Sequence, residues 1–503
     1  MATPALSQEA FHGGDSSPLK SLPAMETAET KVFVAPQTAR HILLTKPTWT
    51  ILCVMLLALL PLGVPSLAQY REYWPNFKEF VTFNGGAAGA LNDVPGGTAD
   101  ASAAVVLPPA PEGSGEIEDG KASLIPFYKS LAATDAKQPN AITRIIHYGD
   151  SPICADLITS TMRRKLQQRF GDAGHGFILA SRPWEWYVHD GIEFASTEWS
   201  SHPMLNGKLP DGMFGLGGVA TRATGSGQIS RYAPAANATN GVNSSRLEVY
   251  YLKQPNGGSF SMSSSDGQQQ TISASDPNTT SGFAELKTNA SGPHTFEIKS
   301  TGGQVRLFGA VLENDNPGVV YDSLGVTGAY AGLLAVQMNE QNWAEQLQHR
   351  KPNLIILNYG TNESQYDAPE NFVTYETDLR EVVRRLRAAL PEAAILIMAP
   401  MDRGRRAGGA IVTHPAIPKI VAMQRRVALE TGCAFFDTFT AMGGEGTIAR
   451  WYAGVNGERL VGGDLMHPKS TGAELVGTLV SDALQKGYER YQSAVNMAAA
   501  QKK

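Results

Sequence analysis

Two short segments more than 300 residues apart contain the residue types of nucleophilic catalysis. Residues 149–151 read Gly-Asp-Ser directly after a short apolar run, and residues 464–467 read Asp-Leu-Met-His. A serine hydroxyl is a poor nucleophile until a base accepts its proton, and a histidine base works best when a carboxylate fixes its tautomer and stabilises the imidazolium. Ser151, His467 and Asp464 together therefore predict an acyl-transfer site.

An acyl-transfer site also needs hydrogen-bond donors for the oxyanion. Asn362 lies in the segment Asn-Tyr-Gly-Thr-Asn-Glu after a strand candidate, and its side-chain amide can donate without adding a charge that perturbs the base. Gly328 lies in the segment Ser-Leu-Gly-Val-Thr-Gly-Ala, where a glycine lets the backbone N–H approach a ligand closely. Gly218, in another glycine cluster, offers the same property and stays open as an alternative to Gly328.

Each of these segments also has an ordinary structural explanation. Gly-Asp-Ser is equally a turn followed by the start of a helix, and Asn362 and Gly328 are common turn residues. Asp and His in a polar loop are often solvated. Their order, with each group at the expected end of a strand, favours a shared site. In such a site, the backbone N–H groups at the start of the helix near Ser151 can also stabilise a developing negative charge.

The elements that must position these residues alternate between strands and helices from about residue 121 onward. We expect strands at 142–148, 353–357, 394–398 and 433–436, and helices at 153–170, 373–390, 417–430 and 470–488. Strands separated by helices of this length predict a parallel sheet with helices on both faces, a three-layer α/β/α domain. Sites in such sheets form at the carboxyl ends of the strands, where Ser151 and Asn362 are expected.

The middle of the chain, residues 183–314, has a different pattern. It is rich in Gly, Ser, Thr and Asn and contains short alternating runs separated by turn clusters, at 246–252, 259–262, 270–272, 294–299 and 305–312. This pattern is typical of an antiparallel β-sandwich. We expect an inserted binding module, with a purely structural insertion as the alternative.

An uncharged apolar run at residues 47–70 precedes the catalytic region. At roughly 20 residues it is long enough to cross a bilayer core of about 30 Å. Basic residues before it predict a cytoplasmic N-terminus, with residues 1–46 as a disordered tail and 71–120 as a linker. A signal peptide cleaved after Ala68 is the alternative. Both interpretations predict export: a membrane-anchored protein with its catalytic domain in the periplasm or outside the cell, or a secreted one.

The composition argues against several other classes of function. The chain has 503 residues and a formal net charge of −5, without a dense Lys/Arg run, so nucleic acid is not an expected partner. Its three cysteines form no C-x-x-C motif, and no histidine pair has H-E-x-x-H spacing. The sequence therefore predicts neither a disulfide scaffold nor a metal site.

The order of the four segments resembles the SGNH (GDSL-type) hydrolases, over about residues 121–490. The resemblance implies a flavodoxin-like hydrolase domain in two parts, 121–182 and 315–490, followed by a tail at 491–503. It implies that Ser151 is the nucleophile and that its N–H, the Gly328 N–H and the Asn362 amide form the oxyanion hole. It implies no metal and no other cofactor.

An exported SGNH domain with an inserted β module resembles the peptidoglycan or polysaccharide O-acetylesterases, whose insert is similar to a carbohydrate-binding domain. An O-acetylated glycan is then the expected substrate. Trp184 and Trp186, with Tyr187 and Trp199 nearby, could stack on sugar rings or pack in the sandwich. Two rival functions stay open: a polysaccharide O-acetyltransferase with the same residues, and a non-catalytic glycan-binding envelope protein.

Overall fold

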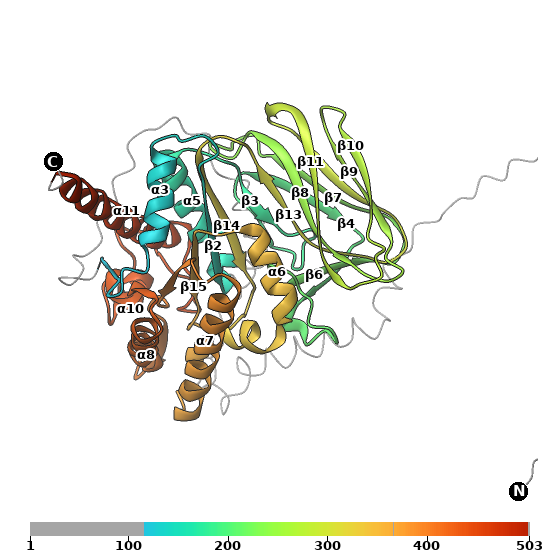
Figure 1. The fold of residues 1–503 in the computed structure, drawn as a ribbon. Helices are drawn as coiled ribbons and strands as arrows, with labels where there is room; N and C mark the ends of the chain where they lie inside the picture. The colour runs from blue at the N-terminus through green and yellow to red at the C-terminus, as the bar shows by residue number, and fades with distance from the viewer. Residues whose placement is uncertain (1–114, 366, 501–503) are drawn as a thin grey trace, which may run out of the picture. The chain divides into compact units, whose positions relative to one another are not determined.

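The computed structural model describes residues 115–365 and 367–500 (Figure 1). The predicted tail 1–46, the apolar segment 47–70 and nearly all of the linker 71–120 lie outside the described residues. Within the described ranges, no helix is both long and apolar enough to span a membrane.

A six-stranded sheet forms the centre of the α/β domain, in the order β1-β19-β16-β15-β2-β14. The five strands from β19 to β14 pair in parallel, and β1 pairs antiparallel with β19. Their bounds are β1 Ile117–Glu118, β2 Ile142–Gly149, β14 Gly318–Gly325, β15 Leu354–Asn358, β16 Ala394–Met398 and β19 Ala434–Phe436. The predicted parallel sheet is confirmed, and its continuous apolar runs reflect burial on both faces.

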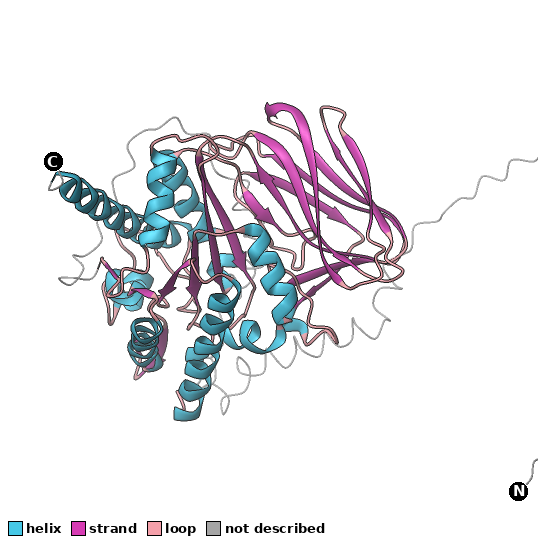
Figure 2. Cartoon of the chain, in the orientation of Figure 1, coloured by secondary structure: helices cyan, strands magenta, loops and turns pink. Residues whose placement is uncertain are grey.

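Helices cover both faces of this sheet, which gives three layers (Figure 2). Alternate side chains of each strand point to opposite faces, so Ile145 packs into one core cluster and Ile146 into the other. Against the face of Ile145 pack α3 Ile125–Asp135, α5 Leu157–Phe170 and α11 Ser470–Ala500. Against the other pack α6 Glu340–Arg350, α7 Pro369–Ala389 and α8 Ala416–Thr431.

Shorter elements lie between these. They are the helices α4 Ser151–Cys154, α9 Thr438–Ala441 and α10 Thr447–Ala453, the 3₁₀ turns Met204–Asn206 and Glu363–Gln365, the π-helical turn Leu333–Gln337, and the hairpin of β17 Gly404–Ala407 and β18 Ala410–Thr413. The expected single helix 153–170 is divided into α4 and α5. The division falls at Asp156, whose φ of 53° is left-handed and cannot continue a helix.

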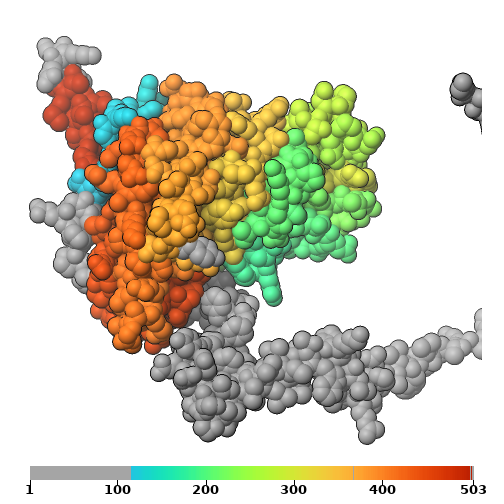
Figure 3. Space-filling view, turned by 90° about the horizontal axis from the view of Figure 1, so that it is seen from below, coloured from blue at the N-terminus to red at the C-terminus, as the bar shows by residue number. Residues whose placement is uncertain are grey.

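Two antiparallel sheets form the inserted β-sandwich, which confirms that prediction. One has the order β10-β9-β12-β7-β4, and the other has the order β11-β8-β13-β6-β5 with β3 paired to β13. The strands are β3 Gly176–Ile178, β4 Ile192–Thr197, β5 Ser200–Pro203, β6 Val219–Ala223, β7 Ser226–Pro234, β8 Ser244–Lys253, β9 Ser259–Ser264, β10 Gln269–Ser273, β11 Thr280–Gly292, β12 Phe296–Gly302 and β13 Val305–Glu313. Since β3 pairs with β13, the sandwich begins before the expected boundary at residue 183. Figure 3 shows sandwich residues in green beside the yellow and orange residues of the α/β domain.

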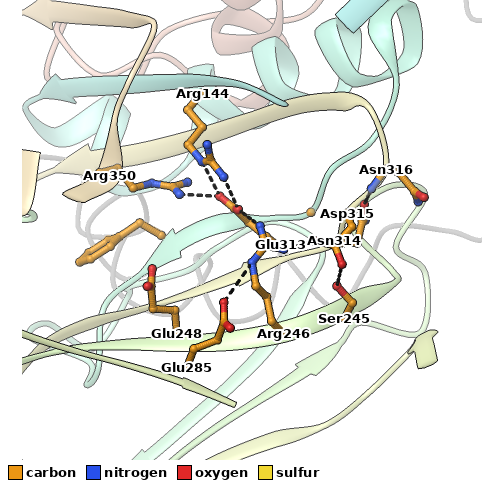
Figure 4. A network of polar contacts seen from close by, with 12 residues as sticks. Arg144, Ser245, Arg246, Glu248, Glu285, Glu313, Asn314, Asp315, Asn316 and Arg350 are labelled. Carbon is orange, nitrogen blue, oxygen red and sulfur yellow. Dashed lines mark hydrogen bonds and ion pairs between the residues drawn. The ribbon is translucent and has the colours of Figure 1, made fainter. Parts of the chain in front are cut away.

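A buried ionic network joins the sandwich to the central sheet (Figure 4). Glu313 at the end of β13 accepts hydrogen bonds from Arg144 of β2, at 2.8 and 3.0 Å, and from Arg246 of β8 and Arg350 of α6. Arg350 also donates to Asp322 of β14 at 2.6 and 2.8 Å. A buried charge is tolerated only when it is paired, so these contacts fix the sandwich against β2 and β14, the strands that lead to the site.

Candidate functional site

The carboxyl ends of three adjacent strands meet at one edge of the sheet. Gly149 of β2 pairs with Gly325 of β14 on one side and with Asn358 of β15 on the other. The Val326 N–H donates to the Gly149 carbonyl at 3.1 Å. The loops that carry Gly328 and Asn362 therefore flank the start of α4, where Ser151 lies.

Two glycines let α4 pack directly on these strand ends. A Cβ on Gly149 would lie 2.4 Å from Ile153 Cγ1, and a Cβ on Gly325 would lie 2.0 Å from the backbone nitrogen of Cys154. Both distances are shorter than any real contact, so a side chain at Gly149 would displace the Ile153 side chain, and one at Gly325 would displace the α4 backbone. Ser151, the first residue of α4, is half-buried, and its N–H has no partner within the helix.

Asp464 and His467 form a hydrogen-bonded pair. The Nδ1 of His467 lies 2.5 Å from Oδ2 of Asp464, and the two side chains are 32% and 36% exposed. An ionised carboxylate can only accept, so Nδ1 is the donor and Nε2 of the neutral ring is left to accept a proton. Oδ1 of Asp464 also accepts from the His467 N–H at 3.1 Å, which holds the loop around the pair.

The loop of this pair contains a strained backbone position. Leu465 has a φ of 59°, a left-handed conformation that is uncommon for a bulky residue. Its side chain is buried, its N–H donates to the Gly462 carbonyl at 3.1 Å, and its carbonyl accepts from the Gly404 N–H at 2.8 Å. The core and the β17–β18 hairpin thus hold a conformation that the loop would not adopt alone.

Charge links His467 to the residue beside Ser151. Burial lowers the pKa of His467, but the hydrogen bond and charge of Asp464, with the charge of Asp150, outweigh it and raise the pKa above its usual value. Burial raises the pKa of Asp150 to about 6, against the opposing effects of a Thr361 hydrogen bond and of His467. The pKa of Asp150 and that of His467 thus depend on each other's charge.

The two loops expected to supply oxyanion donors are cross-linked. Asn362 donates from Nδ2 to the Ala329 carbonyl at 2.8 Å. Glu363 accepts from the Ala331 N–H and from the Gly360 N–H, each at 2.9 Å. Burial raises the pKa of Glu363 to about 7. Gly328 lies in the same loop as Ala329 and has a φ of 71°, which favours glycine.

The alternative glycine, Gly218, lies in a differently connected segment. Its N–H donates to the Gly215 carbonyl at 3.3 Å. The neighbouring N–H groups of Gly215 and Leu216 donate to side chains of α6. This segment thus contacts α6, whereas the Gly328 loop is bonded to the loops beside Ser151.

The aromatic side chains at the start of the insert differ in exposure. The rings of Trp184 and Trp186 are 5.6 Å apart, and Trp186 is 40% exposed. Trp184 and Trp199 are partly buried against the core, and the Tyr187 hydroxyl accepts from the Leu179 N–H at 3.0 Å. Of these four aromatic residues, only Trp186 is exposed enough for its ring to stack on a ligand.

Sequence reasoning missed two charged residues at the site, Glu363 and Arg403. Arg403 donates from Nη1 to the Thr361 carbonyl at 3.2 Å and to the Ser364 hydroxyl at 2.9 Å. Arg403 follows β16 as Ser151 follows β2, and this position after a strand of the parallel sheet could have indicated a site residue. In the described part of the chain, no group of three or more His, Cys, Asp or Glu residues could hold a metal ion.

Comparison with known proteins finds one family match and several similar folds. Residues 288–475 match the GDSL-like lipase/acylhydrolase family, whereas Ser151 precedes this range. A solved peptidoglycan O-acetylesterase is 23% identical, with a TM-score of 0.62, and the match covers 74% of this chain and 99% of that chain. A catalytic mutant of an acetylxylan esterase from Geobacillus stearothermophilus is 20% identical over 34% of this chain and 73% of that chain, with a TM-score of 0.25. No curated protein matched the sequence.

The described residues therefore have the fold of the SGNH (GDSL-type) hydrolases, interrupted by a β-sandwich, and residues 288–475 match the GDSL-like family. In fold, the chain resembles the peptidoglycan O-acetylesterase. The family resemblance predicted from the four segments and the fold class predicted from the strand and helix pattern are confirmed.

Proposed function

We propose that this protein is a serine esterase that removes O-acetyl groups from a cell-envelope or extracellular glycan, either peptidoglycan or a polysaccharide. Ser151 attacks the acetyl carbonyl while Nε2 of His467 accepts the hydroxyl proton. His467 returns this proton to the departing sugar oxygen, which leaves an acetyl ester on Ser151. Water then attacks this ester with His467 as base, and acetate leaves as the Ser151 hydroxyl is restored.

The remaining residues support these two steps. Asp464 orients His467 and stabilises its imidazolium. The N–H groups of Ser151 and Gly328 and the amide of Asn362 bind the oxyanion of each tetrahedral intermediate. Trp186 offers a face for a sugar ring at the edge of the insert.

The Asp464–His467 pair carries the proposal. Its 2.5 Å hydrogen bond fixes the tautomer that a base needs, and the charge of Asp150, the residue before Ser151, helps to raise the pKa of His467. The likeness in fold to a peptidoglycan O-acetylesterase supports the choice of substrate. We extend the proposal to an exported protein, anchored by residues 47–70 or released after signal cleavage.

Product analysis tests the choice of reaction and substrate. The soluble fragment from residue 115 onward is incubated with O-acetylated peptidoglycan and with O-acetylated polysaccharides, with and without an unacetylated oligosaccharide as acceptor. The proposal predicts release of free acetate in both conditions. Acetylation of the acceptor in place of acetate release would favour the transferase, and no reaction together with no labelling of Ser151 by a serine-directed phosphonate would favour a binding protein.

A further inference from the structure

A basic hairpin adjoins the catalytic loop. Residues 403–414, here named the arginine hairpin, contain Arg403, Arg405 and Arg406 and no acidic residue. β17 and β18 form its two strands.

The arginine hairpin is fixed in place at its base. The Gly404 N–H donates to the Leu465 carbonyl at 2.8 Å, which bonds β17 directly to the loop of Asp464 and His467. The buried carboxylate of Asp402 accepts from the Thr413 hydroxyl at 3.1 Å and from the Ile448 N–H at 2.8 Å. These contacts hold both strands against α10.

Arg403 bonds the arginine hairpin to the loop that carries Asn362. Its charge acts on both Asp464 and His467. Its two side-chain hydrogen bonds, to Thr361 and Ser364, both use Nη1. Among the residues that the structure describes, no acceptor is found for its Nη2, so part of a planar donor pair is available beside His467.

Arg405 and Arg406 extend this positive charge along the surface. Both are exposed, and as neighbours in a strand they point to opposite faces of the hairpin. Burial lowers the pKa of His414, and the charges of Arg403 and Arg405 lower it further. Arg406 lies over the ring of Tyr452, with its guanidinium carbon 5.4 Å from the ring centre.

Two acidic side chains near this surface are already engaged with other residues. Asp464 accepts from His467, and Asp367 pairs with Lys419 at 2.7 Å. Neither of these two carboxylates is bonded to Arg405 or Arg406, which are exposed. Guanidinium groups bind carboxylates in a planar, two-point geometry.

We infer that the arginine hairpin binds carboxylate groups of the glycan, so that the substrate of Ser151 is an acidic O-acetylated glycan. This inference rests on the proposed function and narrows its substrate class. The carboxylates belong either to the uronate residues of a polysaccharide or to the peptide-bearing sugars of peptidoglycan, which share this chemistry.

Charge reversal tests the inference. The double variant Arg405→Glu/Arg406→Glu is compared with the wild type on O-acetylated polyuronate, O-acetylated peptidoglycan, neutral O-acetylated xylan and 4-nitrophenyl acetate. We expect at least a tenfold loss of kcat/KM, mostly through KM, on one or both carboxylate-bearing glycans, and little change on xylan or 4-nitrophenyl acetate. The glycan that shows the loss identifies the source of the carboxylate.

Lys129→Glu/Lys299→Glu is the matched control, because it changes the net charge equally at exposed positions on α3 and β12. Equal effects of the two double variants, or equal losses on acidic and neutral glycans, would overturn the inference. Calorimetric titration tests binding without turnover. It uses the Ser151→Ala protein, with and without the hairpin substitutions, and an oligouronate, a muropeptide and a xylo-oligosaccharide as ligands. If the wild type hydrolyses 4-nitrophenyl acetate and Ser151→Ala does not, the proposed esterase activity stands even when the hairpin substitutions have no effect.

Discussion

Opposing effects set the acid–base behaviour of His467. Burial lowers its pKa, and the hydrogen bond and charge of Asp464 raise it further than burial lowers it. A histidine base acts only when neutral, so activity must rise with pH through this pKa. The raised pKa therefore moves the acid limb of the rate profile to higher pH than an unperturbed histidine would give.

The substitution Asp464→Asn removes the charge that raises this pKa. We expect kcat/KM to fall by about 10²- to 10⁴-fold, since the tautomer is no longer fixed, and the acid limb to move to lower pH. A profile of kcat/KM against pH for an acetyl ester measures both effects. Asp367→Asn is the control, and an acid limb that stays or moves upward in Asp464→Asn would contradict this role.

Glu363 acts as a positioning residue because its carboxylate holds the Ala331 and Gly360 N–H groups together. In Glu363→Gln one of these N–H groups faces an amide NH₂, so the oxyanion donors move apart. We expect kcat to fall at least about tenfold with KM little changed, as removal of one such donor costs about 10²- to 10³-fold.

A double-mutant cycle checks this assignment. The losses from Glu363→Gln and Asn362→Ala should be less than additive, because both disturb the same donor. Glu370→Gln, at an exposed position in the first turn of α7, serves as control. Additive losses would indicate that Glu363 acts elsewhere.

The sequence predicted most of the candidate site residues, but it did not predict the residues that hold their loops in place. Ser151, Gly328, Asn362, Asp464 and His467 were found from residue type and position at strand ends, and their catalytic roles stay predictions. The role of Glu363 depends on contacts with a loop about thirty residues earlier in the chain. Periodicity carries no information about such contacts.

At the scale of elements, the position of α4 depends on its close packing against glycines at the strand ends. Gly325→Ala would put a Cβ 2.0 Å from the Cys154 nitrogen and force α4 away from β14. We expect destabilisation of about 1–3 kcal/mol and a larger fractional loss of kcat. Thermal unfolding and esterase kinetics measure these effects. Gly225→Ala, which meets no atom within 4 Å, is the control, and equal behaviour of the two variants would contradict the packing account.

The sequence predicted the alternating α/β elements well, because their apolar patterns are strong. It missed β14, in which Asp322 and Ser323 interrupt the apolar run. A buried Asp322 is tolerated because Arg350 and the Phe177 N–H satisfy it, and both partners are distant in sequence. Likewise, the expected single helix after Ser151 is divided by a left-handed residue that is not glycine.

At the scale of the whole described region, the Glu313 network joins the sandwich to the hydrolase domain. Burial raises the pKa of Glu313, but three arginines lower it well below its usual value. Its ionised form therefore stabilises the fold at neutral pH, and this contribution is lost as the pH falls below the ordinary glutamate range. The sequence predicted the order of the two domains but not this junction, because its members come from β2, β8, β13 and α6.

Glu313→Gln leaves buried arginine charges without their partner. We expect the free energy of unfolding to fall by about 3–5 kcal/mol. Glu285→Gln removes a 41% exposed partner of Arg246 and should change it by no more than about 1 kcal/mol. Denaturant titration of both variants measures the difference, and similar values for the two would contradict a structural role for the network.

The central claim is that Ser151 is the nucleophile of an esterase. Its most direct test is kcat/KM for hydrolysis of an acetyl ester by the wild-type protein and by Ser151→Ala, with folding of both verified by thermal unfolding. We predict a loss of at least about 10³-fold in the folded variant. Undiminished hydrolysis by Ser151→Ala would contradict the assignment.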